Sequence, residues 1–128
     1  MLEHWYTILL ICFYTITTNI IIMMSKLDTV FSKYHKVTNM SYSELLRWSN
    51  NPCSREASLD RKPIMRNLRL LSKSKSKWTA KDITDANRTI AFVSRMKKVK
   101  GGEKVNDCGL SKRDISLLNW AYDVRKKR

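Results

Sequence analysis

The sequence predicts an all-α fold, a small bundle of four to five short helices preceded by an apolar N-terminal segment. Only three glycines and two prolines interrupt its 128 residues. Outside the N-terminal segment no alternating run of apolar and polar residues reaches five positions, so β-strands are not indicated. Apolar residues recur instead at spacings of three and four, the period of packed amphipathic helices. The expected organisation is an apolar segment (1–24), a basic helical domain (25–124) and a basic tail (125–128).

The first segment contains an uncharged run, WYTILLICFYTITTNIIIMM, over residues 5–24. Its length matches that of a helix crossing a bilayer. As a transmembrane anchor it would place Trp5 and Tyr6 near one interface. The lysines that begin at Lys26 would then put the basic domain in the cytoplasm by the positive-inside rule.

A second interpretation of this segment has equal weight. Residues 23–26 read Met-Met-Ser-Lys, which fits the start of a soluble cytoplasmic protein preceded by upstream sequence. A cleaved signal peptide fits poorly, because Glu3 and His4 precede the run and no small-residue cleavage site follows it. A buried core helix is also disfavoured, since the remaining chain is too small to cover it.

The next two elements are short helices. Residues 27–37 carry apolar side chains at i, i+3, i+4 and i+7. After them, Ser41 and Glu44 have the spacing of a capping box, and Met40 with Leu45 has that of a hydrophobic staple. This second helix is expected to end at Asn50-Asn51-Pro52, because a proline disfavours helical geometry in the residue before it.

Two basic amphipathic helices over residues 61–100 dominate the middle of the chain, joined by the lysine-serine run 73–77. Asp60 or Ser58 is expected to cap the first helix. One face of that helix carries Lys62, Arg66, Arg69 and Lys73. A solvated face would normally mix charges of both signs, but no acid lies between Arg61 and Lys81. This absence of local partners predicts a surface that faces an anion.

The second of these helices begins with a capping box, Thr79 and Asp82. Its cations lie opposite an apolar stripe, with Phe92 among them, and Phe92 is expected to form a packing face in preference to stacking on a base. Gly101 is expected to end the helix in the left-handed conformation. The apolar stripe consists of Ile83, Ala86, Ile90 and Val93, and the cations are Lys81, Arg88 and Arg95.

The last helix starts at Ser111 and should be well buried, since it is apolar on most sides. Its Trp120, together with Trp48 and Trp78, is expected to anchor the core. The chain then ends in the basic tail 125–128, which is expected to be mobile.

The three cysteines indicate no disulfide framework and no zinc site, because Cys12, Cys53 and Cys108 are far apart and odd in number. A bridge between Cys53 and Cys108 would need an oxidising compartment, and reduced thiols in the cytosol are the favoured expectation. Cys53 with His35 is the minimum for a thiol nucleophile, but no orienting residue accompanies them. The chain is therefore predicted not to be an enzyme, with no catalytic residue, metal, cofactor or small-molecule substrate.

The net charge of +14 predicts a polyanionic partner. Nucleic acid, DNA or RNA, is the first expectation, bound mainly through phosphate contacts. The alternative is a single-pass membrane protein whose basic cytoplasmic domain binds anionic lipid or an acidic protein partner. The residues predicted to bind nucleic acid are Lys62, Arg66, Arg69, Lys73, Lys75, Lys77, Lys81, Arg88, Arg95, Arg125, Lys126, Lys127 and Arg128.

Overall fold

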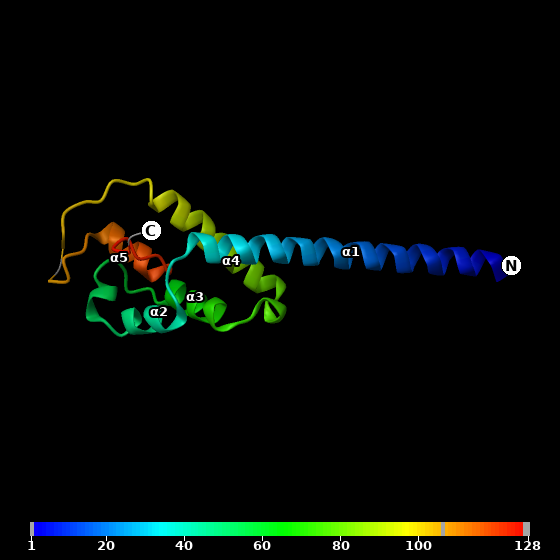
Figure 1. The fold of residues 1–128 in the computed structure, drawn as a ribbon, viewed down its shortest axis with the longest axis horizontal. Helices are drawn as coiled ribbons and strands as arrows, with labels where there is room; N and C mark the ends of the chain where they lie inside the picture. The colour runs from blue at the N-terminus through cyan, green and yellow to red at the C-terminus, as the bar shows by residue number, and fades with distance from the viewer. Residues whose placement is uncertain (1, 106, 127–128) are drawn as a thin grey trace.

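The computed structural model describes residues 2–105 and 107–126, with side chains from residue 5 onward. This part of the chain contains helices and no β-strand, which confirms the all-α prediction. Figure 1 shows one long helix that projects away from a cluster formed by the others. The elements are α1 (Leu2–Val37), α2 (Tyr42–Ser49), η1 (Pro52–Arg55), α3 (Lys62–Ser72), η2 (Lys75–Lys77), α4 (Ala80–Met96) and α5 (Lys112–Asn119), where η denotes a 3-10 helix.

The helix expected over residues 27–37 is not separate, because α1 runs unbroken from Leu2 to Val37. No glycine or proline occurs within these 36 residues. The threonines of the apolar run fit the helix by donating their hydroxyl hydrogens to carbonyl groups four residues earlier, as Thr15 does to Ile11 at 2.9 Å. The prediction was therefore wrong in treating residue 27 as a helix start.

The two halves of α1 have different surroundings. Side chains from Trp5 to Met24 are exposed almost throughout, and α1 is long and apolar enough to cross a membrane by length and composition. Burial begins with Leu27 and is complete at Tyr34, which has 0% exposure. The exposed half confirms that this run is not a buried core helix, and the buried half attaches α1 to the domain.

The domain has two apolar clusters with α3 between them. The first joins α2, α3 and α5, and the second joins α1, α3 and α4. Ile64 lies in the first cluster, Leu70 in the second, and Leu71 packs against both. The first cluster contains Met40, Leu45, Trp48, Ile64, Leu110, Ile115, Leu118 and Ala121, and the second contains Val30, Tyr34, Leu70, Trp78, Ile83, Ala86 and Ile90.

A buried amide links three helices at the centre of the domain. The Asn67 Oδ1 atom accepts hydrogen bonds from the Tyr34 hydroxyl at 2.8 Å and from the Thr89 hydroxyl at 2.9 Å. The Asn67 side-chain nitrogen donates to the Pro63 carbonyl at 2.8 Å. Because all of these polar groups are satisfied, the network fixes α1 and α4 against α3 without a desolvation penalty.

The predicted helix starts are largely confirmed. Capping boxes are present at Ser41 with Glu44 and at Thr79 with Asp82, and the Ser111 hydroxyl accepts the Asp114 N–H. The residue at the N-cap of α3 is Arg61, which makes no side-chain cap, although Asp60 accepts the Lys62 N–H at 3.0 Å.

The predicted left-handed cap at Gly101 is wrong. Helix α4 ends at Met96, and Arg113 from the start of α5 donates to the Val99 carbonyl at 2.7 Å. This contact carries the chain toward α5 before Gly101 is reached. Among the described residues, the left-handed positions are Gly109 and Ala121.

Two of the three tryptophan anchors are confirmed as core residues, with Trp48 at 6% and Trp78 at 7% exposure. The indole N–H of Trp48 donates to Asn119 Oδ1 at 2.8 Å, which ties α2 to α5. Trp120 is half-buried and stacks on Phe92, with ring centroids 4.3 Å apart. The packing role expected for Phe92 is thus also confirmed.

The expectation of reduced thiols at Cys53 and Cys108 is contradicted, because their sulfur atoms are bonded in the structure. An antiparallel bridge between Lys104 and Ser111 turns the intervening segment back. This turn brings Cys108 to η1, where Cys53 lies. A bonded Cys53 is not a free nucleophile, while Cys12 in the exposed half of α1 remains free.

Candidate anion-binding groove between α3 and α4

Helices α3 and α4 border a groove of about 640 Å³. It is lined by Arg61, Lys62, Met65, Arg66, Arg69, Lys81, Asp85 and Arg88. Six of these eight residues are lysine or arginine and one is acidic. We call this feature the cationic groove.

The groove contains cations from the predicted basic faces of both helices. Lys62, Arg66 and Arg69 come from α3, and Lys81 and Arg88 come from α4. Lys73 and Arg95, which were predicted to belong to the same basic faces, do not line the groove. The helical periodicity therefore placed most of these side chains on the correct faces, and helix packing made the faces converge.

The expectation that the α3 cations lack acidic partners is wrong for two of them. Arg69 Nε lies 3.0 Å from Asp82 Oδ1, and Arg69 also bonds Asp85. Lys73 Nζ lies 2.9 Å from Asp82 Oδ2. Both acids are almost fully buried, with side-chain exposures of 1% for Asp82 and 5% for Asp85. They belong to the first turns of α4, just beyond the acid-free interval of the sequence.

Asp82 is the centre of this arrangement. Its burial opposes ionisation, but the bonds from Lys73, from the Thr79 N–H and from Arg69 outweigh that effect and lower the pKa of Asp82 to about 2. Its position in the first turn of α4 further favours a negative charge. Asp82 is therefore ionised at neutral pH and holds α3 and the η2 turn against α4.

Arg66 is held in the groove by aromatic packing instead of an acid. Its guanidinium carbon lies 5.3 Å from the centroid of the Trp120 ring, which stacks on Phe92 from α4. The Arg66 Nε atom is buried and has no hydrogen-bond partner among the described residues. A buried donor without an acceptor costs free energy, so an anion that oriented the guanidinium would relieve an existing deficit.

Besides Arg61, which donates to the Ser49 carbonyl and the Ser54 hydroxyl, four groove cations have no carboxylate within ion-pair distance among the described residues. They are Lys62, Arg66, Lys81 and Arg88, and apart from the half-buried Arg66 they are exposed. Asp85 is bonded to Arg69 and leaves these four uncompensated. An arrangement of this kind can bind phosphate groups, because arginine and lysine donate charge-assisted hydrogen bonds to phosphate oxygens.

The remaining predicted site residues are dispersed. Lys75 pairs with Asp28 of α1 at 2.7 Å, and Lys77 is exposed beside it in η2. Arg95 lies over the Phe92 ring at 5.7 Å. None of the three contributes to the cationic groove.

Both cations of the described part of the basic tail make ion pairs. Arg125 bonds Asp123 with an Nε–Oδ1 distance of 2.9 Å, and Lys126 pairs with Glu44. The first pair joins residues two apart in sequence, whereas the second joins the tail to α2. The other predicted tail residues, Lys127 and Arg128, lie outside the described residues.

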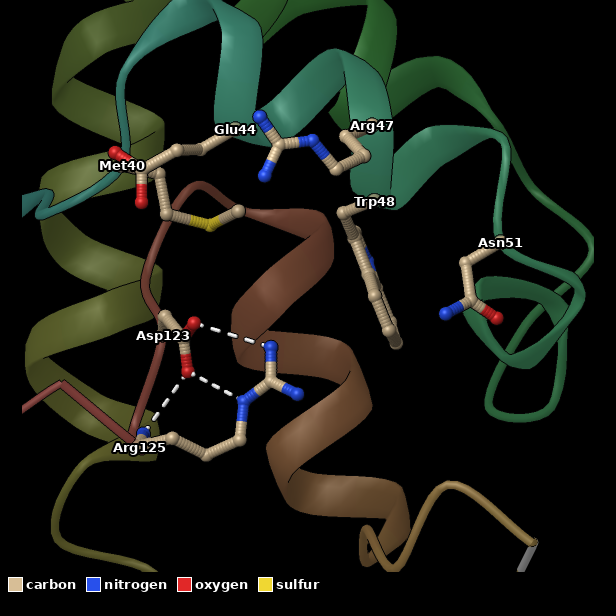
Figure 2. A pocket seen from close by; sticks show the side chains of 7 residues that line it. All are labelled: Met40, Glu44, Arg47, Trp48, Asn51, Asp123 and Arg125. Atoms are coloured by element: carbon tan, nitrogen blue, oxygen red, sulfur yellow. Dashed lines mark hydrogen bonds and ion pairs between the residues drawn. The ribbon is translucent and has the colours of Figure 1, made fainter.

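A smaller cavity of about 180 Å³ lies between α2 and the segment after α5 (Figure 2). Arg125 lines it, but its guanidinium is bonded to Asp123, as the dashed lines of Figure 2 show. Arg47 reaches from α2 toward the same cavity, near Glu44. The mixture of charges makes this cavity a poorer anion site than the cationic groove.

Three groove residues were not predicted, namely Arg61, Met65 and Asp85. Arg61 donates to the Ser49 carbonyl at 2.8 Å and to the Ser54 hydroxyl at 3.0 Å, so it supports the connection between α2 and η1. Asp85 follows Asp82 by three residues, and both flank the apolar stripe of α4. That spacing on a buried helix edge was the available indication that acids from α4 face α3.

A scan against protein-family models found no matching family, and searches of curated proteins and of solved structures found no similar protein.

Proposed function

We propose that the helical domain binds nucleic acid through phosphate contacts in the cationic groove. The observation that carries the proposal is the set of four uncompensated cations, Lys62, Arg66, Lys81 and Arg88, in one groove between two helices. Phosphates occur at regular spacing along a nucleic acid strand, so several cations in one groove can bind successive groups.

The fixed arrangement of the two helices that carry these cations supports the same function. The ion pairs of Asp82 hold α3 and α4 together, and Arg66 is stacked on Trp120. A preorganised set of donors loses less side-chain entropy on binding than a flexible tail would. Because phosphate contacts carry no sequence information, the binding is expected to depend weakly on nucleotide sequence.

The test is a salt titration of binding to DNA and RNA fragments by the full chain in a non-ionic detergent. The groove variant replaces Lys62, Arg66, Lys81 and Arg88 by glutamine. Its expected slope of log affinity against log salt is smaller by about 0.9 per lost contact on duplex DNA, or about 0.7 on a single strand.

The matched control removes the same charge elsewhere, by replacing Lys98, Lys100, Lys104 and Lys112 with glutamine. All four are exposed and lie outside the groove. The control is expected to keep most of the affinity and slope. Equal losses in the two variants would show that net charge alone causes binding, and no binding at low salt by the unaltered chain would contradict the proposal.

A second function is supported by α1. We propose that the chain is a single-pass membrane protein, because the exposed half of α1 presents 20 uncharged and mostly apolar residues to its surroundings, enough to cover roughly 30 Å. Water cannot accommodate such a surface without a large hydrophobic cost. The unbroken helix would hold the domain directly at the membrane surface.

The test is alkaline carbonate extraction of membranes, combined with the intact mass of the natively expressed protein. An anchored chain stays in the membrane pellet and has a mass that includes residues 5–24. A soluble product that begins at Met24 or Ser25 would contradict the anchor and would leave the groove proposal unaffected.

Two features favour opposite sides of the membrane for the domain. The lysines after the span favour the cytoplasmic side, as for the alternative function stated above. The bond between Cys53 and Cys108 is typical of an oxidising compartment. A membrane-impermeant thiol reagent applied to intact cells after reduction distinguishes the two orientations, because it labels Cys53 and Cys108 only if the domain lies outside.

A further inference from the structure

We propose that an anionic phospholipid binds at the base of the exposed half of α1, with its acyl chain beside Trp78 and its phosphate near lysines of α1 and η2. The site is an apolar groove of about 290 Å³, which we call the Trp78 groove. It is lined by Ile20, Met23, Met24, Leu27, Trp78, Thr79, Ala80 and Ile83. This inference rests on the proposed membrane anchor.

The groove lies where the apolar span meets the domain. Ile20, Met23 and Met24 end the exposed half of α1, whereas Trp78 and Ile83 belong to the start of α4. In Figure 1 the turn between α3 and α4 lies on the side of the domain toward the free part of α1. With residues 5–24 in the hydrocarbon, this junction would lie at the level of the lipid headgroups.

Trp78 supplies the second observation, independent of the apolar lining. The side chain is only 7% exposed, and its Nε1–H has no hydrogen-bond acceptor in the structure. Its ring is fixed by edge-on contacts with Phe31 at 4.9 Å and Tyr34 at 5.5 Å. A buried indole N–H is normally paired, and a lipid ester or phosphate oxygen is an acceptor of the required kind.

The charges next to the groove select an anionic headgroup. Lys26, Lys77 and Lys81 are exposed, and each is adjacent in sequence to a residue that lines the groove. Lys75 pairs with Asp28 of α1 at 2.7 Å, which holds the lysine-serine turn at the end of the span. Cations near a membrane surface bind anionic headgroups in preference to zwitterionic ones.

The experiment uses the full chain carrying Trp5→Phe, which removes the tryptophan inside the span. The chain is reconstituted in phosphatidylcholine vesicles that contain phosphatidylglycerol. Brominated acyl chains, which quench tryptophan fluorescence on contact, are placed on one lipid or the other. Competition between the two lipids gives their relative affinity for the site.

Brominated phosphatidylglycerol is expected to quench the tryptophan fluorescence more strongly than brominated phosphatidylcholine does. The double variant Lys26→Gln with Lys77→Gln should lose roughly fivefold of this preference for each lysine. The matched control, Lys98→Gln with Lys100→Gln, removes the same charge away from the groove and should keep the preference. Substitution Trp78→Phe should abolish the lipid-dependent quenching, which assigns the signal to this groove.

Equal quenching by the two lipids, or a preference unchanged in the Lys26 and Lys77 variant, would overturn the lipid site while leaving the anchor intact. Quenching that persists after Trp78→Phe would overturn it as well. If carbonate extracts the chain from the vesicles, the anchor itself fails and the lipid site fails with it.

Discussion

The cations of this protein fall into two regions that share their side-chain chemistry but differ in their surroundings. In the cationic groove, Lys62, Lys81 and Arg88 are exposed without an acidic partner among the described residues. At the edge of the groove and the end of α3, Arg69 and Lys73 are bonded to buried Asp82. The first region leaves positive charge available for a ligand, and the second uses it to hold α3 against α4. Basic composition alone therefore does not reveal which cations are available to bind.

The largest expected effect comes from removing the acid that defines the paired region. Asp82→Ala should destabilise the domain by about 3 kcal/mol, because it removes the partner of Lys73, one of the two partners of Arg69, and the capping box of α4. The measurement is urea unfolding of the full chain in a non-ionic detergent. Asp28→Ala is the control, since its pair with Lys75 is exposed and should contribute less than about 1 kcal/mol.

The second-largest effect is expected at acid pH, which should weaken the ion pairs of Asp82. The folded-state pKa of Asp82, about 2, lies below its ordinary value of 3.8, so the ionised form stabilises the fold. This contribution of about 2 kcal/mol is complete above pH 4 and is lost as the pH falls from about 4 to about 2. Unfolding free energies measured over this range should fall less in Asp82→Asn than in the unaltered chain. Parallel pH profiles would contradict the assignment to Asp82.

Arg66 is intermediate between the unpaired and the acid-paired cations. It packs on an aromatic ring and has no acidic partner among the described residues. Arg66→Lys should lower stability by about 0.5–1 kcal/mol, since a lysine lacks the planar group that packs on Trp120. It should also weaken binding to nucleic acid. Arg88→Lys, on the exposed side of the groove, should leave stability within about 0.5 kcal/mol, and equal losses in both variants would show that the stacking contributes nothing.

The smallest effect is expected at the tail, where a paired cation is partly exposed. Lys126 pairs with Glu44, and the side chains are 35% and 36% exposed, so screening by water limits the interaction. A double-mutant cycle with Lys126→Gln and Glu44→Gln should give a coupling of about 0.5 kcal/mol. The same substitution at Lys126 should leave the salt dependence of nucleic-acid binding unchanged. A smaller slope of log affinity against log salt would show that Lys126 contacts the nucleic acid.

Local features of the fold followed from the sequence because they depend on neighbouring residues. The capping boxes at Ser41 and Thr79 need partners only three residues away, and the 3.6-residue period alone assigns Lys62, Arg66 and Arg69 to one face. The dependence of these predictions on neighbouring residues also explains why the prediction at Gly101 was wrong. Gly101 was given a capping role from its type alone, whereas a contact from Arg113 decides where the chain turns.

The sequence by itself therefore determined the helical class, most helix starts, the apolar span and the excess of positive charge, because each is a property of composition or of short-range spacing. Only the tertiary structure decided which cations remain unpaired, since Asp82 and Asp85 reach α3 through the packing of α4. Tertiary packing likewise decided that Cys53 meets Cys108, which is 55 residues away in sequence. Contacts between distant segments are set by how helices pack, and one sequence does not encode that packing in any local pattern.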